Sequence, residues 1–175
     1  MTVGGSAYDV NMPFAHDTVS SLRAAVDLVN SGEEPDTLRT VAHVDAWYAE
    51  HGYTGRRDGD EAELATLRAL RPVLRELLTA GRDRAAELVN AMLADAGALP
   101  QLVRHDGLDW HIHAVPADAP LDRRVVVESA KDAAETIANA SPARISAPGA
   151  LSSAIRPMTD DSRAWRVSFQ HALRP

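Results

Sequence analysis

Three of the seven histidines lie in one short stretch, residues 101–115, which reads QLVRHDGLDWHIHAV. His111 and His113 are two residues apart, so on a strand their imidazoles would project from the same face, ~6.6 Å apart along the chain. Such a pair could line a polar ligand pocket, make structural hydrogen bonds, or bind a metal with a third ligand from His16, Asp17 or His105. We expect no metal, because nothing in the sequence brings a third ligand close.

His16 stands beside Asp17, which is expected to cap the first helix. A histidine there could donate a hydrogen bond or act as a general base. If the protein is an enzyme, the candidate catalytic residues are therefore His111, His113 and His16. No Ser-His-Asp spacing, phosphate-binding loop or carboxylate pair indicates a particular reaction, and we expect no cofactor.

A ligand pocket would need further polar and aromatic groups. Asn30 could offer its amide to the interior, and Trp110 could form an apolar wall, as could Trp47 and Tyr48. Arg71 belongs to a stripe with Arg68 and Arg75. This stripe is either solvated near Asp60, Glu61 and Glu63 or binds an anion or carboxylate. The expected ligand-binding set is His16, Asn30, Arg71, Trp110, His111 and His113.

The histidine stretch is expected to be a β-hairpin. Leu108, Trp110, Ile112 and Ala114 alternate with the residues between them, which is the period of a strand. Asp106-Gly107 suits a tight turn, and Leu102-Val103 would begin the partner strand.

Helical spacing of apolar residues dominates the rest of the chain up to residue 140. It predicts helices at 17–30, 40–52, 64–78, 83–97 and 118–137, the third with Pro72 inside and the last capped by Asp118. After residue 140 the alternation of Trp165, Val167 and Phe169 predicts a strand, with 151–155 as a partner. The expected fold is α+β, predominantly helical, with about five helices around a small antiparallel sheet.

Composition limits the partners. The net charge of −7 argues against unaided binding to nucleic acid. The charge is uneven, because residues 144–175 hold five arginines against two aspartates, giving +3, which leaves −10 on residues 1–143. The sequence has no cysteine, no apolar run of ~20 residues and no visible signal peptide. We expect a cytoplasmic protein with no membrane partner.

Three segments of the chain resemble a known family. They are FAHDTVSSLRAAVDLVNS, DTLRTVAHVDAWYAEHGYTGRRDGDEAELATLRALRPVLREL and AAELVNAMLADAGALPQLVRHDGLDWHIHAVPADAPL, within residues 14–140. Together they are similar to the ABATE domain, the N-terminal half of regulators described as stress-induced that carry a CGNR zinc finger. The resemblance implies a helical domain followed by a compact DNA-contacting finger.

The chain departs from this pattern after Ile145. Where the family has its zinc-binding cysteines and a Cys-Gly-Asn-Arg motif, this chain reads SAPGALSSAIRPMTDDSRAWRVSFQ. Serine and alanine cannot replace zinc thiolates, so a finger that folds around its metal would not form here. DNA binding by the family's route is therefore not expected, and residues 141–175 are interpreted as a remodelled remnant of the finger.

These observations divide the chain into an arm (1–15), an ABATE-like helical domain (16–140) containing the hairpin 101–115, and the remnant (141–175). The leading hypothesis is a domain that binds a small organic ligand between the first and third helices and the hairpin. It would serve as a sensor or in specialised metabolism, and a homodimer is left open as an alternative to a monomer. The alternatives are a cofactor-independent enzyme that uses histidine for acid–base chemistry, and a transcription regulator that acts through its tail or a partner.

Overall fold

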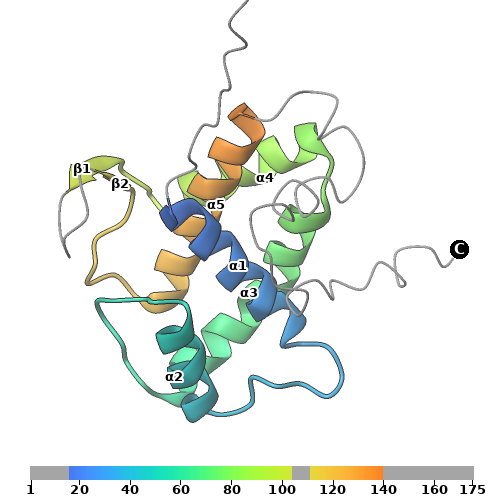
Figure 1. The fold of residues 1–175 in the computed structure, drawn as a ribbon, viewed down its shortest axis with the longest axis vertical. Helices are drawn as coiled ribbons and strands as arrows, with labels where there is room; N and C mark the ends of the chain where they lie inside the picture. Colours follow the sequence, from blue (N-terminus) through green and yellow to red (C-terminus); the bar gives the residue numbers. More distant parts are fainter. Residues whose placement is uncertain (1–15, 104–110, 140–175) are drawn as a thin grey trace, which may run out of the picture.

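Five helices and one two-stranded antiparallel sheet make up residues 16–103 and 111–139, the part of the chain that this computed structural model describes (Figure 1). In chain order the elements are α1 (His16–Asn30), α2 (Val41–Glu50), α3 (Glu61–Thr79), α4 (Arg82–Asp95), β1 (Gln101–Val103), β2 (His111–His113) and α5 (Leu121–Asn139). The predicted class, α+β and predominantly helical, is confirmed. The sheet projects from one side of the helices.

The core is formed mainly by α1, α3, α4 and α5, because α1 packs against α3 and α5, and α4 packs against both of those helices. The leucine stripe of α3 faces this core and is fully buried at Leu67, Leu74, Leu77 and Leu78. Burying one leucine side chain contributes about 1.5–3 kcal/mol. The buried leucines of this predicted helix therefore stabilise the domain.

Short-range signals set the ends of the middle helices, as expected for α2, whereas α3 begins three residues before its predicted start. The hydroxyl of Thr40 accepts a hydrogen bond from the backbone N–H of His43 at the start of α2, and Asp60 does the same for Glu63 at the start of α3. After α2, Gly52 adopts a φ of 66°, a left-handed conformation that favours glycine. Pro72 lies inside α3, which runs on to Thr79.

The predicted start of the fifth helix is wrong by a few residues. Asp118 does not cap it, because α5 begins at Leu121 and the residues just before it form a turn. The carbonyl groups of this turn have other donors. The oxygen of Ala117 accepts from the backbone N–H of Arg56 at 3.0 Å, and that of Ala119 accepts from the Arg124 side chain at 3.2 Å. Long-range contacts thus decide where the helix starts.

The hairpin is present, with Leu102 paired opposite Ile112 in the antiparallel register. Both side chains are largely exposed, at 62% and 47%. The predicted turn at Asp106-Gly107 and Trp110 lie outside the described residues. So do the arm at 1–15, the remnant at 141–175 and the strands predicted within it.

Across the described ranges, every helix is too short or too polar to cross a bilayer.

Candidate functional site

A pocket of about 500 Å³ lies between the C-terminal half of α1 and the facing side of α2. Its residues recur at helical spacing on both helices, which places them on the two sides that face each other. The connection between α1 and α2 completes the wall. The lining residues are Arg23, Asp27, Asn30, Ser31, Thr37, Leu38, His43, Ala46, Trp47 and Glu50.

A histidine–carboxylate pair joins the two helices beside this pocket. His51 follows α2, and its Nε2 lies 3.3 Å from Oδ2 of Asp27 on α1. The imidazole is only 4% exposed, whereas the carboxylate is 29% exposed and lines the pocket. The separation is within ion-pair distance, but Nε2 makes no hydrogen bond among the described residues.

The aromatic wall of the pocket is a stack centred on Trp47. Its ring lies 5.1 Å from that of Tyr53 in a stacked arrangement and 5.3 Å from that of His51 in a tilted one. Trp47 is 6% exposed, and its indole N–H is buried without a hydrogen-bond acceptor among the described residues. A buried donor without a partner costs about 1–3 kcal/mol.

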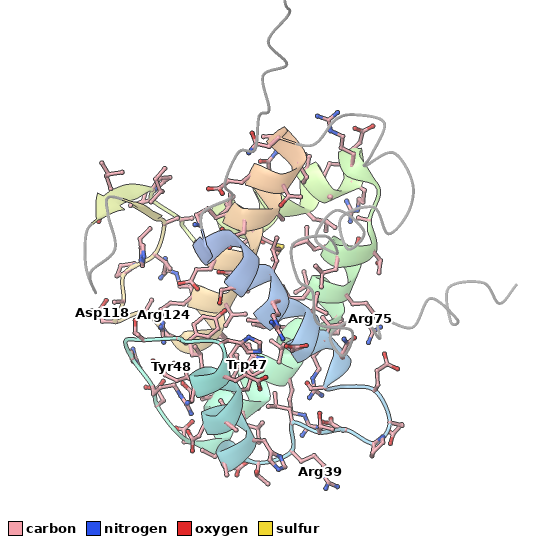
Figure 2. All side chains as sticks on the ribbon, viewed as in Figure 1. Arg39, Trp47, Tyr48, Arg75, Asp118 and Arg124 are labelled. Atoms are coloured by element: carbon pink, nitrogen blue, oxygen red, sulfur yellow. The ribbon has the colours of Figure 1, made fainter. Side chains whose placement is uncertain are left out.

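The loop after α2 carries Tyr53 and is fastened to α5 by a buried arginine. The guanidinium of Arg124 donates to the carbonyl oxygens of Thr54, Arg56 and Ala119. Figure 2 shows Arg124 directed from α5 toward this loop, with Trp47 and Tyr48 on the adjoining α2. The glycine-rich segment GYTGRRDG is therefore a structural connection that supports the aromatic wall.

The opposite end of the pocket is held by the arginine stripe of α3. Arg71 donates to both carboxylate oxygens of Asp36, at 2.8 and 3.1 Å, and to the hydroxyl of Ser31 at 2.9 Å. Its hydrogen bond holds the pKa of Asp36 at about 2, below its ordinary 3.8. Arg75 pairs with Glu33 at 2.8 Å. The stripe does bind carboxylates, and those described here belong to the chain's own loop.

The predicted ligand-binding residues are spread over the molecule. Asn30 lines the α1–α2 pocket, and Arg71 reaches the same region through Ser31. His16 begins α1, so the helix holds it ~21 Å from Asn30. His111 and His113 lie at the two ends of β2, on the projecting sheet, and His113 is half-buried. Trp110 lies outside the described residues, and the binding roles of all six remain predictions.

The sequence interpretation missed Asp27 and His51. Asp27 lies on the polar side of an amphipathic helix and His51 follows a helix end, which are ordinary places for charged and polar residues. Their meeting depends on how α1 packs against α2. A usable signal was Trp47 next to Tyr48 and shortly before Tyr53, because three aromatic rings so close together indicate a stacked wall.

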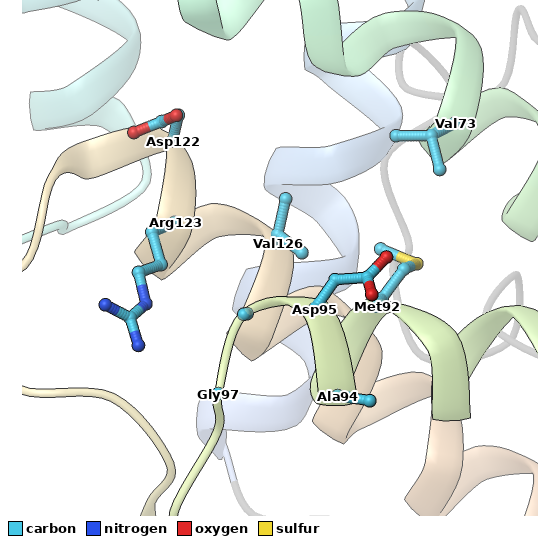
Figure 3. Close-up of a pocket in the computed structure, with 9 residues that line it drawn as sticks. Val73, Met92, Ala94, Asp95, Gly97, Asp122, Arg123 and Val126 are labelled. Carbon is cyan, nitrogen blue, oxygen red and sulfur yellow. The ribbon is translucent and has the colours of Figure 1, made fainter.

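A second hollow, of about 580 Å³, lies between α4 and α5 (Figure 3). It is lined by Val73, Met92, Ala94, Asp95, Ala96, Gly97, Asp122, Arg123 and Val126. Neither hollow offers a metal centre, since no three potential metal ligands of the His, Cys, Asp or Glu type converge among the described residues.

Comparison with known families assigns the chain. The profile of a family named ABATE, described as "Putative stress-induced transcription regulator", matches residues 22–140, which is more than half of the sequence. The chain belongs to the ABATE family. The match covers all five helices, the hairpin and the α1–α2 pocket, apart from the first turns of α1. Searches of curated proteins and of solved structures found no match.

The sequence contains no cysteine, so it cannot supply the thiolates of a zinc finger built on a Cys-Gly-Asn-Arg motif. The ABATE domain is thus present in a chain that has no cysteine ligands for such a finger.

Proposed function

We propose that this ABATE domain is the sensing part of a stress-response regulator and that it binds a small organic molecule in the α1–α2 pocket. The output would pass through the tail or a partner protein, in place of a zinc finger. The observation that carries the proposal is the pocket itself, with a partly exposed carboxylate at Asp27 and a buried, unsatisfied indole N–H at Trp47.

The size and lining of the pocket support this proposal. About 500 Å³ is within the usual range for small-molecule sites. Leu38 and Trp47 supply an apolar floor, while Asp27 and Glu50 present carboxylates. A matching ligand has an apolar body and at least one hydrogen-bond donor for the carboxylates.

The two walls are held before any ligand arrives. Arg124 fastens the loop that supports Trp47, and Arg71 fastens the loop that begins at Ser31. Binding to walls already in place loses little free energy to ordering, which favours affinity for a small ligand.

The test is a thermal-shift screen of the whole chain against a library of small polar metabolites and drugs, followed by calorimetry on each compound that raises the melting temperature. Asp27→Asn should weaken binding by about 10-fold or more, because a hydrogen bond to a charged group contributes about 1.5–3 kcal/mol. The matched control is Asp122→Asn, which makes the same change in the other hollow and should leave binding unchanged.

A screen in which no compound stabilises the chain would contradict the proposal. Equal affinities for the wild type and Asp27→Asn would also contradict it, because the ligand would then lie elsewhere.

The Asp27–His51 pair favours one second candidate, a cofactor-independent enzyme that uses His51 as a general base. The imidazole lies 3.3 Å from a carboxylate that lines the pocket, which would place a histidine base beside a bound compound. Mass spectrometry of each compound found in the screen, before and after incubation with the chain, distinguishes the two functions. An enzyme changes the mass or structure of the compound and loses that activity in His51→Gln, whereas a sensor returns the compound unaltered.

A further inference from the structure

The hollow between α4 and α5 combines an apolar floor with an acidic rim. Val73, Met92 and Val126 form the floor, and the carboxylates of Asp95 and Asp122 stand at the rim. Met92 is buried, Val73 and Val126 are half-buried, and Asp95 is exposed. Such a surface suits a segment that carries both apolar and cationic side chains.

Neither rim carboxylate has a cationic partner within the described ranges, unlike Asp36 and Glu63. Asp36 is paired with Arg71, and Glu63 is paired with Arg57 at 2.9 Å. Arg123 also lines the hollow, but its guanidinium lies over Gly97, 3.4 Å from where a Cβ would stand. In Figure 3 it points away from both carboxylates. The negative charge of the rim is therefore available to a cation from outside the helices.

We propose that this hollow is the docking site for the chain's own C-terminal segment, residues 162–175. The segment reads SRAWRVSFQHALRP and contains three arginines and no acidic residue. Its apolar side chains suit the floor of the hollow, and they are Trp165, Val167, Phe169 and Leu173. Its three arginines suit the acidic rim, and they are Arg163, Arg166 and Arg174. The opposite charges of residues 144–175 and residues 1–143 favour the same encounter.

The connection is long enough for the segment to return to the hollow. Twenty-two residues, 140–161, separate α5 from the segment, and they can span up to ~70 Å. The hollow lies near the start of α5, a helix only ~28 Å long. Because the two parts share one chain, docking is an intramolecular event, and contacts weaker than those of two separate molecules are sufficient. Docked there, the arginines are withheld from any other anionic partner.

The natural absence of cysteine allows a direct test on the full chain. Ala94→Cys places one thiol at the hollow, where Ala94 is exposed, and Ser168→Cys places the other in the segment. Mild oxidation should give a monomeric product with an internal disulfide. Adding Asp95→Lys and Asp122→Lys should slow its formation by about 10-fold, since attraction is replaced by repulsion at two positions.

The matched control adds Glu34→Lys and Glu61→Lys instead, which changes the net charge equally at two exposed acids away from the hollow. This control should cross-link at the rate of the parent. Circular dichroism of each variant checks that the helices are intact. A second cysteine pair, Ala49→Cys with Ser168→Cys, should cross-link slowly, because Ala49 is on α2 and does not line the hollow.

Equal rates for the rim variant and the charge control would overturn the proposal. So would disulfides formed mainly between two chains, which would mean that the hollow receives a second copy. Neither result depends on the α1–α2 pocket, so this proposal and the sensor proposal can fail separately.

Discussion

Replacing Asp132 by asparagine should stabilise the domain at neutral pH. Asp132 is on α5 and is fully buried at the interface with α1. Burial raises the pKa of its carboxyl from 3.8 to about 6, although the Lys131 ammonium, 3.0 Å away, and the Ser21 hydroxyl oppose this change. The folded state therefore holds the proton more tightly than the unfolded chain does, and ionisation above the folded pKa lowers stability.

The size of the effect follows from the two pKa values. The difference between 3.8 and about 6 corresponds to about 3 kcal/mol. The wild type has the full benefit of the protonated carboxyl below about pH 4 and loses it as pH rises through about 6. Asparagine resembles the protonated acid and does not ionise. Asp132→Asn should therefore be about 3 kcal/mol more stable than the wild type at pH 8 and about equal at pH 3.5.

The assay is urea unfolding of both proteins between pH 3.5 and 8, monitored by circular dichroism. At pH 8 the melting temperature of the variant should also be higher by about 6–12 °C for a chain of this size. A variant that is less stable than the wild type at pH 8, or a stability difference that does not change with pH, would refute the reasoning. Such results would mean that the Lys131 ion pair outweighs the cost of burying the charge.

Three further changes test the connections that support the pocket. Gly55→Ala should lower the free energy of unfolding by about 1–3 kcal/mol in urea titrations, because φ is 89° and the new Cβ would clash with the carbonyl oxygen of Ala117. Arg124→Leu should cost about 3 kcal/mol in the same assay by leaving three carbonyl groups without their donor. The control, Arg84→Leu, removes an exposed arginine with two surface ion pairs and should have a much smaller effect. Asp36→Asn should lower stability by about 1 kcal/mol at pH 7, a figure reduced for its partial exposure. This loss should shrink as pH falls from about 4 toward 2, because the folded pKa of Asp36 is about 2.

Helix positions could be predicted from the sequence because their signals are local. The leucines of α3 repeat at helical spacing, and the start of α2 at Thr40 and its stop at Gly52 depend on residues within one turn. The start of α5 could not be predicted in this way. A turn whose carbonyl groups bind Arg56 and Arg124 replaces the expected cap, and the chain pattern does not show that contact.

The candidate site was harder to predict than the helices. Helical spacing correctly placed the three arginines of α3 on one face but could not show which loop covers it. The acids expected to lie near these arginines, Asp60, Glu61 and Glu63, do not pair with them. Glu63, for instance, accepts hydrogen bonds from Arg57 and from the backbone N–H groups of Asp58 and Gly59. The arginines bind Asp36 and Glu33 instead. Partners tens of residues apart are determined by packing, which no short window of sequence contains.

The same packing links the pocket to the rest of the domain. Tyr53 stacks on Trp47, and Arg57 lies 4.8 Å over the ring of Tyr48 while pairing with Glu63 at the start of α3. Arg124 then joins this loop to α5, the helix that also borders the second hollow. A ligand that moved Trp47 would therefore disturb α5 through Arg124, because a buried guanidinium cannot lose its carbonyl partners without cost. Arg124 is thus the residue through which we expect the α1–α2 pocket to influence the α4–α5 hollow.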